Sequence, residues 1–132
     1  MKGLLLVIVL ATLLIVPTTR SGTYSSPDDT IKMPDQSYVG MWYGQKGAAP
    51  DELIILEIND DTIRFCLSLF RITTIYATAK IEDSEIKFVQ DDIEAPIKGR
   101  LVFHKNSISV IIDESWFEYI DAGTVYGFPY RE

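Results

Sequence analysis

Two neighbouring stretches of the sequence, Thr62–Phe70 (TIRFCLSLF) and Thr73–Ile81 (TTIYATAKI), decide the fold. In both, apolar side chains recur at every second position, which is the period of a β-strand with one buried face. Their short separation predicts an antiparallel pair, because parallel strands need a long crossover connection. The buried face is expected to carry Ile63, Phe65, Leu67 and Leu69 in the first stretch and Ile75, Ala77, Ala79 and Ile81 in the second.

The same period holds over most of the chain from Tyr38 onward, with short polar turns between the segments that show it. About eight short strands are indicated, a pattern typical of a β-sandwich or an up-and-down barrel. Trp116–Ile120 (WFEYI) fits either a strand or one helical turn. We predict an all-β, antiparallel up-and-down meander closed into a small barrel, because closure removes exposed strand edges; a β-sandwich is the alternative. The expected strands are 38–43, 52–58, 62–70, 73–81, 85–89, 97–104, 107–112 and 124–130.

The predicted inward face is bulky. A barrel of eight strands is just wide enough to be filled by its own side chains or to hold one small ligand. Large side chains at the inward positions favour a filled interior. The residues expected to point inward are Ile54, Leu56, Phe65, Leu67, Ile75, Phe88, Leu101, Phe103, Val110 and Phe128.

The N-terminus predicts export. Lys2 precedes Gly3–Val16, an unbroken run of 14 apolar or near-apolar residues that Pro17 ends. That length matches the core of a signal peptide, about 7–15 residues, and is shorter than the roughly 20 that span a bilayer as a helix. We therefore expect a signal peptide over 1–21, a disordered leader over 22–37 and a β-barrel domain over 38–132. The protein would be secreted, or alternatively tethered to a membrane by an uncleaved N-terminal segment.

The composition is acidic and becomes more so on export. Removal of Lys2 and Arg20 leaves 10 of the 12 basic residues against 19 acidic ones and brings the net charge from −7 to −9. Such a chain repels the phosphates of nucleic acids and the surface of anionic membranes. Nucleic acid and membrane are therefore not expected as partners of the mature domain, which we expect to be a monomer.

Two resemblances follow from short motifs. Gly40-Met41-Trp42 resembles the G-x-W motif of lipocalins, whose Trp closes the barrel floor under a basic residue from a late strand; here that residue would be Arg131. A wider set of motifs resembles uncharacterised secreted bacterial domains with a small lipocalin-like or calycin-like β-barrel. This resemblance implies the barrel and little about activity. The motifs are Tyr38–Trp42 (YVGMW), Ser68–Thr73 (SLFRIT), Gly99–Phe103 (GRLVF) and Gly123–Phe128 (GTVYGF).

Four residues are candidates for binding a ligand. Arg71 shares its parity with the inward residues of 62–70, so strict alternation would point its guanidinium inward at the barrel mouth, where it would need a carboxylate or carbonyl partners. The alternative is a strand that ends or bulges at Phe70, or an internal salt bridge. Trp42, Trp116 and Tyr126, like Tyr119, are aromatic anchors that would line a pocket or a partner surface, or else serve ordinary packing.

No catalytic, cofactor or metal motif stands out. His104 is the only histidine, Cys66 is the only cysteine, and the acidic stretch Asp91–Glu94 (DDIE) lacks the spacing of a calcium loop, so we expect a solvated loop. We predict a non-enzymatic binding module that takes a small apolar or amphipathic ligand and uses no cofactor or metal. The alternative is a protein-binding inhibitor or surface-interaction domain that engages a basic protein, in the manner of small-barrel inhibitors of cationic lysozymes.

Overall fold

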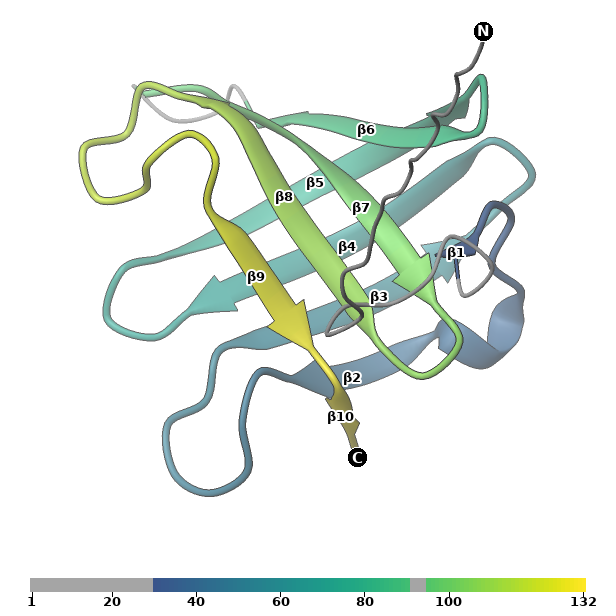
Figure 1. Ribbon diagram of the computed structural model, residues 1–132, viewed down its shortest axis with the longest axis horizontal. Helices are drawn as coiled ribbons and strands as arrows, with labels where there is room; N and C mark the ends of the chain where they lie inside the picture. The colour runs from purple at the N-terminus through teal and green to yellow at the C-terminus, as the bar shows by residue number, and fades with distance from the viewer. Residues whose placement is uncertain (1–29, 91–94) are drawn as a thin grey trace, which may run out of the picture.

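The computed structural model describes residues 30–90 and 95–132 and shows one antiparallel sheet wound into a nearly closed barrel (Figure 1). Strands β2 to β9 follow one another around the sheet in chain order, which confirms the predicted all-β meander. They are β2 (Gly40–Tyr43), β3 (Glu52–Ile58), β4 (Thr62–Leu69), β5 (Thr73–Glu82), β6 (Glu85–Gln90), β7 (Ile97–His104), β8 (Ile108–Ser115) and β9 (Val125–Phe128).

The barrel is nearly closed because the last segment of the chain is divided between two partners. Strand β9 pairs with β8, and after Pro129 the short strand β10 (Tyr130–Arg131) pairs with β2. Proline has no backbone N–H to give to a ladder, so it is placed naturally where the chain leaves one strand for another. Tyr130 lies opposite Tyr43, and Arg131 lies opposite Trp42. The predicted single strand over 124–130 is therefore two shorter strands.

The interior is filled by side chains. The residues named first in the sequence, Ile63, Phe65 and Leu67, are completely buried on β4, and Phe65 packs edge-on against Phe88 with ring centroids 5.0 Å apart. The largest core residues have less than 2% of their surface accessible to water, counting both bulk solvent and internal voids. The described interior is therefore packed as a protein core is. Those residues are Trp42, Leu53, Ile55, Ile63, Phe65, Leu67, Ile75, Ile97, Phe103, Ile108, Ile112 and Phe128.

The predicted orientation of strand β3 was wrong. Leu53 and Ile55 point inward and are buried, whereas Ile54 lies on the outer face and Leu56 is exposed. The segment ELIILEI has apolar side chains at both parities, so its own alternation does not fix the inward face. Pairing fixes it, because Leu53 lies between Trp42 of β2 and Leu67 of β4. An irregularity in register between Ile55 and Glu57 then leaves Leu56 outside.

The folded unit also begins before the predicted boundary at Tyr38. Strand β1 (Thr30–Ile31) pairs with the end of β7, and the single 3-10 turn η3 (Gln36–Tyr38) starts at Asp35, whose carboxylate accepts from the backbone N–H of Ser37. The Gln36 side-chain amide donates to the carbonyl of Ile58 at 2.8 Å. A two-residue strand and one capped turn have too little periodicity to be recognised in the sequence. The predicted signal peptide 1–21, the remaining leader 22–29 and the acidic loop 91–94 lie outside the described residues.

Gly99 on β7 gives a test of this packing. A Cβ at Gly99 would lie 2.4 Å from the carbonyl oxygen of Ile111 and 2.7 Å from the ring of Phe88, whereas a Cβ at Gly127 on β9 meets nothing within 4 Å. We predict that Gly99→Ala lowers the free energy of unfolding by about 1–3 kcal/mol, because overpacking forces the backbone or the ring to move. Gly127→Ala, measured beside it in urea, should change stability by less than about 1 kcal/mol. Equal effects would contradict the register of β7 and β8.

Candidate functional site

The barrel has two distinct ends. Turn η3 and the β3–β4, β5–β6 and β7–β8 turns lie at one end, which we call the η3 end, and the connections after β2, β4 and β8 lie at the other, which we call the loop end (Figure 1). This separation follows from the antiparallel meander, in which alternate connections fall on alternate ends. The four predicted ligand-binding residues divide between them.

Trp42 and Arg131 form a clamp near the η3 end. The Trp42 side chain is 2% exposed, and its indole N–H donates to the backbone carbonyl of Tyr38 at 3.0 Å. The rings of Trp42 and Tyr38 stack with their centroids 5.8 Å apart. The Arg131 guanidinium lies 4.3 Å from the centre of the Trp42 ring. The contact between this Trp and a basic residue from a late strand, expected from the G-x-W motif, is thus present in the structure. Trp42 serves packing here and is separated from the other predicted site residues.

Hydrogen bonds fix the Arg131 side chain in this clamp. Its guanidinium donates to the carbonyl oxygens of Ser37 at 2.7 Å and Val39 at 3.1 Å, which ties β10 to the segment that leads into β2. Gly40 has φ +131°, and a Cβ there would lie 3.3 Å from an Arg131 nitrogen. Glycine is therefore favoured at the first position of the motif both by the backbone and by the close approach of Arg131.

Arg71 lies at the loop end and does not point inward. Strand β4 ends at Leu69, and a tight turn follows in which the Ile72 N–H donates to the carbonyl of Leu69 at 2.9 Å. Arg71 has φ +63° in this turn, is exposed, and places its guanidinium 5.2 Å from the centre of the Phe70 ring. The inward orientation from strict alternation was wrong, and the structure favours the alternative of an early strand end, since β4 ends at Leu69, one residue before Phe70.

The β4–β5 turn is also tied to a neighbouring loop. The backbone N–H of Phe70 donates to a carboxylate oxygen of Asp51 at 2.8 Å, across from the β2–β3 connection. The Phe70 side chain is 49% exposed. This bond fixes an exposed aromatic ring and a charged residue at adjacent positions of the loop end. Neither Phe70 nor Asp51 was identified as a site residue from the sequence, because Phe70 was expected within the strand.

Trp116 and Tyr119 stand out from the connection between β8 and β9, at 74% and 65% exposure. This connection consists of turns rather than the strand or helical turn considered for Trp116–Ile120. Its backbone is held because Ile120 is buried, Phe117 packs against the core, and the Trp116 N–H donates to the carbonyl of Pro96 at 3.0 Å. Tyr119 packs edge-on against Phe117 with centroids 5.4 Å apart. The exposed rings are therefore presented on an anchored loop.

Tyr126 on β9 is half-buried, and acidic groups surround it. Burial raises the pKa of its phenol, and the nearby carboxylates of Asp51 and Asp121 raise that pKa further. The phenol is therefore uncharged and a hydrogen-bond donor over the physiological pH range. Tyr126 therefore lies close to carboxylates of both the β2–β3 and the β8–β9 connections.

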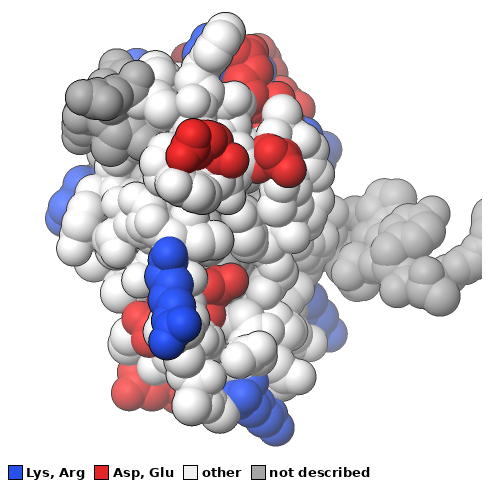
Figure 2. Space-filling model, turned by 90° about the vertical axis from the view of Figure 1, so that its left-hand side faces the viewer, with Lys and Arg blue, Asp and Glu red and all other residues white. Residues whose placement is uncertain are grey.

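These residues define what we call the loop-end surface. Figure 2 shows this end of the molecule, where a broad uncharged area carries a few acidic and basic side chains. Three of the four predicted site residues, Arg71, Trp116 and Tyr126, lie at this end, and Trp42 does not. The loop-end surface consists of the apolar side chains Phe70, Ile72, Trp116 and Tyr119, the carboxylates Asp51, Glu118 and Asp121, and Arg71.

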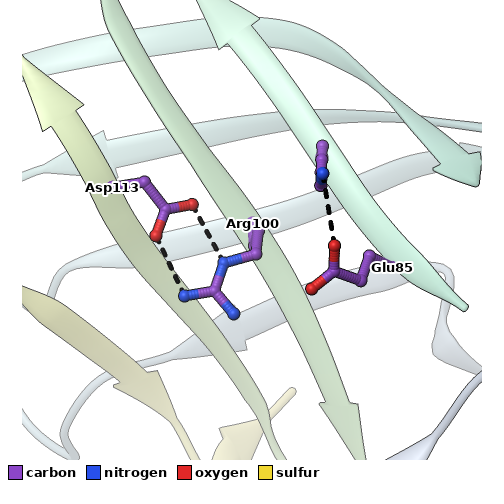
Figure 3. Close-up of polar contacts among 4 residues, drawn as sticks. Glu85, Arg100 and Asp113 are labelled. Carbon is purple, nitrogen blue, oxygen red and sulfur yellow. Dashed lines mark hydrogen bonds and ion pairs between the residues drawn. The ribbon is translucent and has the colours of Figure 1, made fainter.

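Several charged groups elsewhere on the barrel are paired with one another. On the outer face of β7 and β8, Arg100 donates two hydrogen bonds of 2.9 Å to Asp113, and beside them Glu85 forms an ion pair of 3.2 Å with Lys87 (Figure 3). These pairs are substantially exposed, and such pairs contribute little to stability or to ligand binding. Among the described residues, no three His, Cys, Asp or Glu side chains form a cluster that could hold a metal.

The chain has one histidine and one cysteine, side chains that often serve as a general base or a nucleophile in enzymes. His104 approaches the Ser109 hydroxyl through Nε2 at 3.3 Å, but its Nδ1 has no hydrogen-bond partner in the described structure. A Ser–His–acid arrangement would need a carboxylate at that nitrogen. Cys66 is buried on the outer face of the sheet between Ile54 and Tyr76.

Comparisons of the chain with sequence models of protein families, with curated proteins and with solved structures give no match. Within residues 30–90 and 95–132, no helix is long and apolar enough to cross a membrane. The function must therefore be inferred from the surfaces just described.

The clamp predicts a stability effect at Arg131. We expect Arg131→Gln to lower the free energy of unfolding by about 1–2 kcal/mol, because hydrogen bonds from the guanidinium and its contact with Trp42 are lost together. Arg64→Gln is a matched control, since Arg64 makes one exposed ion pair of 2.8 Å with Glu57, and should change stability by less than about 0.5 kcal/mol. Urea unfolding of both variants measures this. A smaller loss at Arg131 than at Arg64 would show that the clamp does not close the barrel.

The surroundings of Cys66 predict a thiol of low reactivity. Burial raises the pKa of its thiol, and a hydrogen bond with Tyr76 offsets part of that rise. Because the pKa of the thiol is higher in the folded state than in the unfolded state, the neutral thiol favours folding relative to the thiolate. This contribution to the free energy of unfolding is complete below the unfolded-state pKa and is lost as the pH rises through the folded-state pKa. We expect native protein to be alkylated by iodoacetamide at pH 8 at least about tenfold more slowly than urea-unfolded protein. Equal rates would point to an accessible, activated cysteine.

Proposed function

We propose that this protein is a secreted, non-enzymatic binding module that engages a basic protein partner through its loop-end surface. The observation that carries the proposal is the group of large exposed apolar side chains at that end, Phe70, Ile72, Trp116 and Tyr119. Large apolar side chains exposed on the connections of one end favour that end as an interaction site, and Trp and Tyr are enriched among the residues that dominate binding energy.

The charge of this surface favours a cationic partner. The carboxylates of Asp51, Glu118 and Asp121 accompany the aromatic residues, against the single guanidinium of Arg71. The mature chain would carry a net charge of −9 once Lys2 and Arg20 are removed. Complementary charge accelerates association and selects partners more than it adds affinity. Secretion follows from the apolar run at 3–16, and a tether to the membrane is the alternative location.

A carrier of a small apolar or amphipathic ligand is the second candidate function. The barrel and the contact between Trp42 and Arg131 favour it, because both resemble features of lipocalins. A ligand in the interior would have to displace core side chains such as Phe65 and Phe103, which are completely buried. For that reason we rank the outer surface above the interior as the binding site.

Binding to a cationic protein tests the proposal. Lysozyme immobilised on a sensor should bind the mature domain, and raising the salt from about 50 to 300 mM should weaken binding at least about tenfold, since rim charges are screened. Tyr119→Ala, and more strongly Trp116→Ala, should weaken binding at least about fivefold at low salt.

Tyr76→Ala is the matched control, because Tyr76 on β5 has the same 65% exposure as Tyr119 but lies outside the loop-end surface. It should bind as the unmodified protein does. Absence of binding to lysozyme and to other cationic secreted proteins would overturn the proposal. So would salt-insensitive binding, or equal losses at Tyr76 and Tyr119.

A further inference from the structure

A separate hollow of about 570 Å³ lies on the side of the barrel where β10 pairs with β2. Its volume is within the usual range for small-molecule sites, about 300–1,000 Å³. It is lined by the β2–β3 connection and the chain around Pro129, including Tyr43, Gln45, Lys46, Glu52 and Tyr130. None of these five side chains belongs to the loop-end surface, and the hollow shares only Arg131 with the clamp.

Two tyrosines line the hollow side by side. Tyr43 and Tyr130 are directly opposite in the β2–β10 register. Their side chains are therefore neighbours on the outer face of the barrel, since Cβ atoms of such pairs lie about 4.5–5.5 Å apart. The Lys46 ammonium lies 5.3 Å from the centre of the Tyr130 ring. A cation at an exposed ring contributes only about 0.5–1 kcal/mol, so a ligand can displace it and use the ring itself.

The polar groups of the hollow include donors and acceptors and charges of both signs. Lys46 and Gln45 supply donors, and Gln45 and Glu52 supply acceptors, with one positive and one negative charge among them. The Arg131 guanidinium also borders the hollow, but it is engaged by two carbonyl oxygens and the Trp42 ring. Burial and the carboxylates of Glu132 and Glu52 raise the pKa of Tyr43, which keeps its phenol uncharged. Neither an anion nor a cation is favoured over a neutral ligand.

We propose that this hollow binds a neutral sugar ring of a glycan. A pyranose has an apolar C–H face that stacks on aromatic rings and a rim of hydroxyl groups, each of which donates and accepts hydrogen bonds. A pair of aromatic side chains with donors and acceptors around it matches both features. A purely apolar ligand would leave these polar groups without partners, which is unfavourable. The proposal is independent of the loop-end surface and goes beyond protein binding.

Amide-resolved NMR titration with cellobiose and with maltose tests the inference. Saturable shifts are expected on residues 43–52 and 130–132, with dissociation constants in the millimolar range, so the sugar is raised to about 50 mM. Tyr130→Leu should weaken binding at least about fivefold, whereas Tyr130→Phe keeps the ring and should stay within about twofold. Tyr119→Ala at the loop end should bind sugar as the unmodified protein does.

A second variant covers the case in which Tyr130→Leu disturbs the pairing of β10. The Gln45 side chain bonds only within its own loop, to the carbonyl of Ala48 at 3.3 Å, so Gln45→Ala leaves the sheet intact. It should weaken sugar binding about threefold, for the loss of one hydrogen bond. Absence of saturable shifts with either sugar would overturn the inference. So would unchanged affinity in both variants, or shifts that arise only with a proline-rich peptide, the other ligand that packs on paired tyrosines.

Discussion

The pairing of β10 with β2 is the contact on which the rest of this structure depends. It joins the two ends of the meander through the chain itself, since β9 pairs with β8 and β10, directly after it, pairs with β2. The sheet is thereby nearly closed, and part of the β2 edge is covered, which leaves less of it to pair with another chain. Arg131 reinforces the join by lying over Trp42 while donating to the carbonyls of Ser37 and Val39. Two residues near the C-terminus thereby fix η3, the start of β2 and the floor of the barrel at once.

The nearly closed sheet and its filled interior together favour binding on the outside of the barrel over binding inside it. A small closed sheet with Phe65, Phe103 and Phe128 inside has its interior occupied by its own side chains. The side chains that vary freely in such a fold are those on the loops and on the outer face. The loop-end surface and the Tyr43–Tyr130 hollow lie at these two places, and we propose the first as a site for a protein and the second as a site for a sugar. The two sites share no residue, so either proposal can be disproved without affecting the other.

The sequence predicted most of the fold where the period of two was strict. In β4 and β5 every second residue is apolar, and the inward faces came out as expected. It misplaced Ile54 and Leu56 because ELIILEI is apolar at both parities, and only the neighbours Trp42 and Leu67 decide which face is buried. Strand β1 was missed because its two residues show no period and pair with a distant partner, Phe103–His104.

The candidate site was only partly predictable, because here too contacts with neighbouring segments, and not the local alternation of residues, decide where side chains lie. Trp116 and Tyr126 were recognisable as aromatic anchors, and Arg131 as the partner of Trp42, from the residues alone. Arg71 was placed at the correct end but with the wrong orientation, because the chain turns at Phe70 with a positive φ that alternation cannot foresee. The Tyr43–Tyr130 hollow depends on a pairing between opposite ends of the domain, which no local pattern reveals.

NMR of the interior methyl groups tests most directly the claim that the barrel is filled and binds only on its outside. The neutral apolar probe N-phenyl-1-naphthylamine is added to the mature domain while the methyl signals of Leu67, Ile75 and Val110, all buried, are followed. A filled barrel predicts that these signals stay unchanged throughout the titration. Saturable shifts, or magnetisation transfer from the probe to these methyl groups, would show a ligand inside and contradict it.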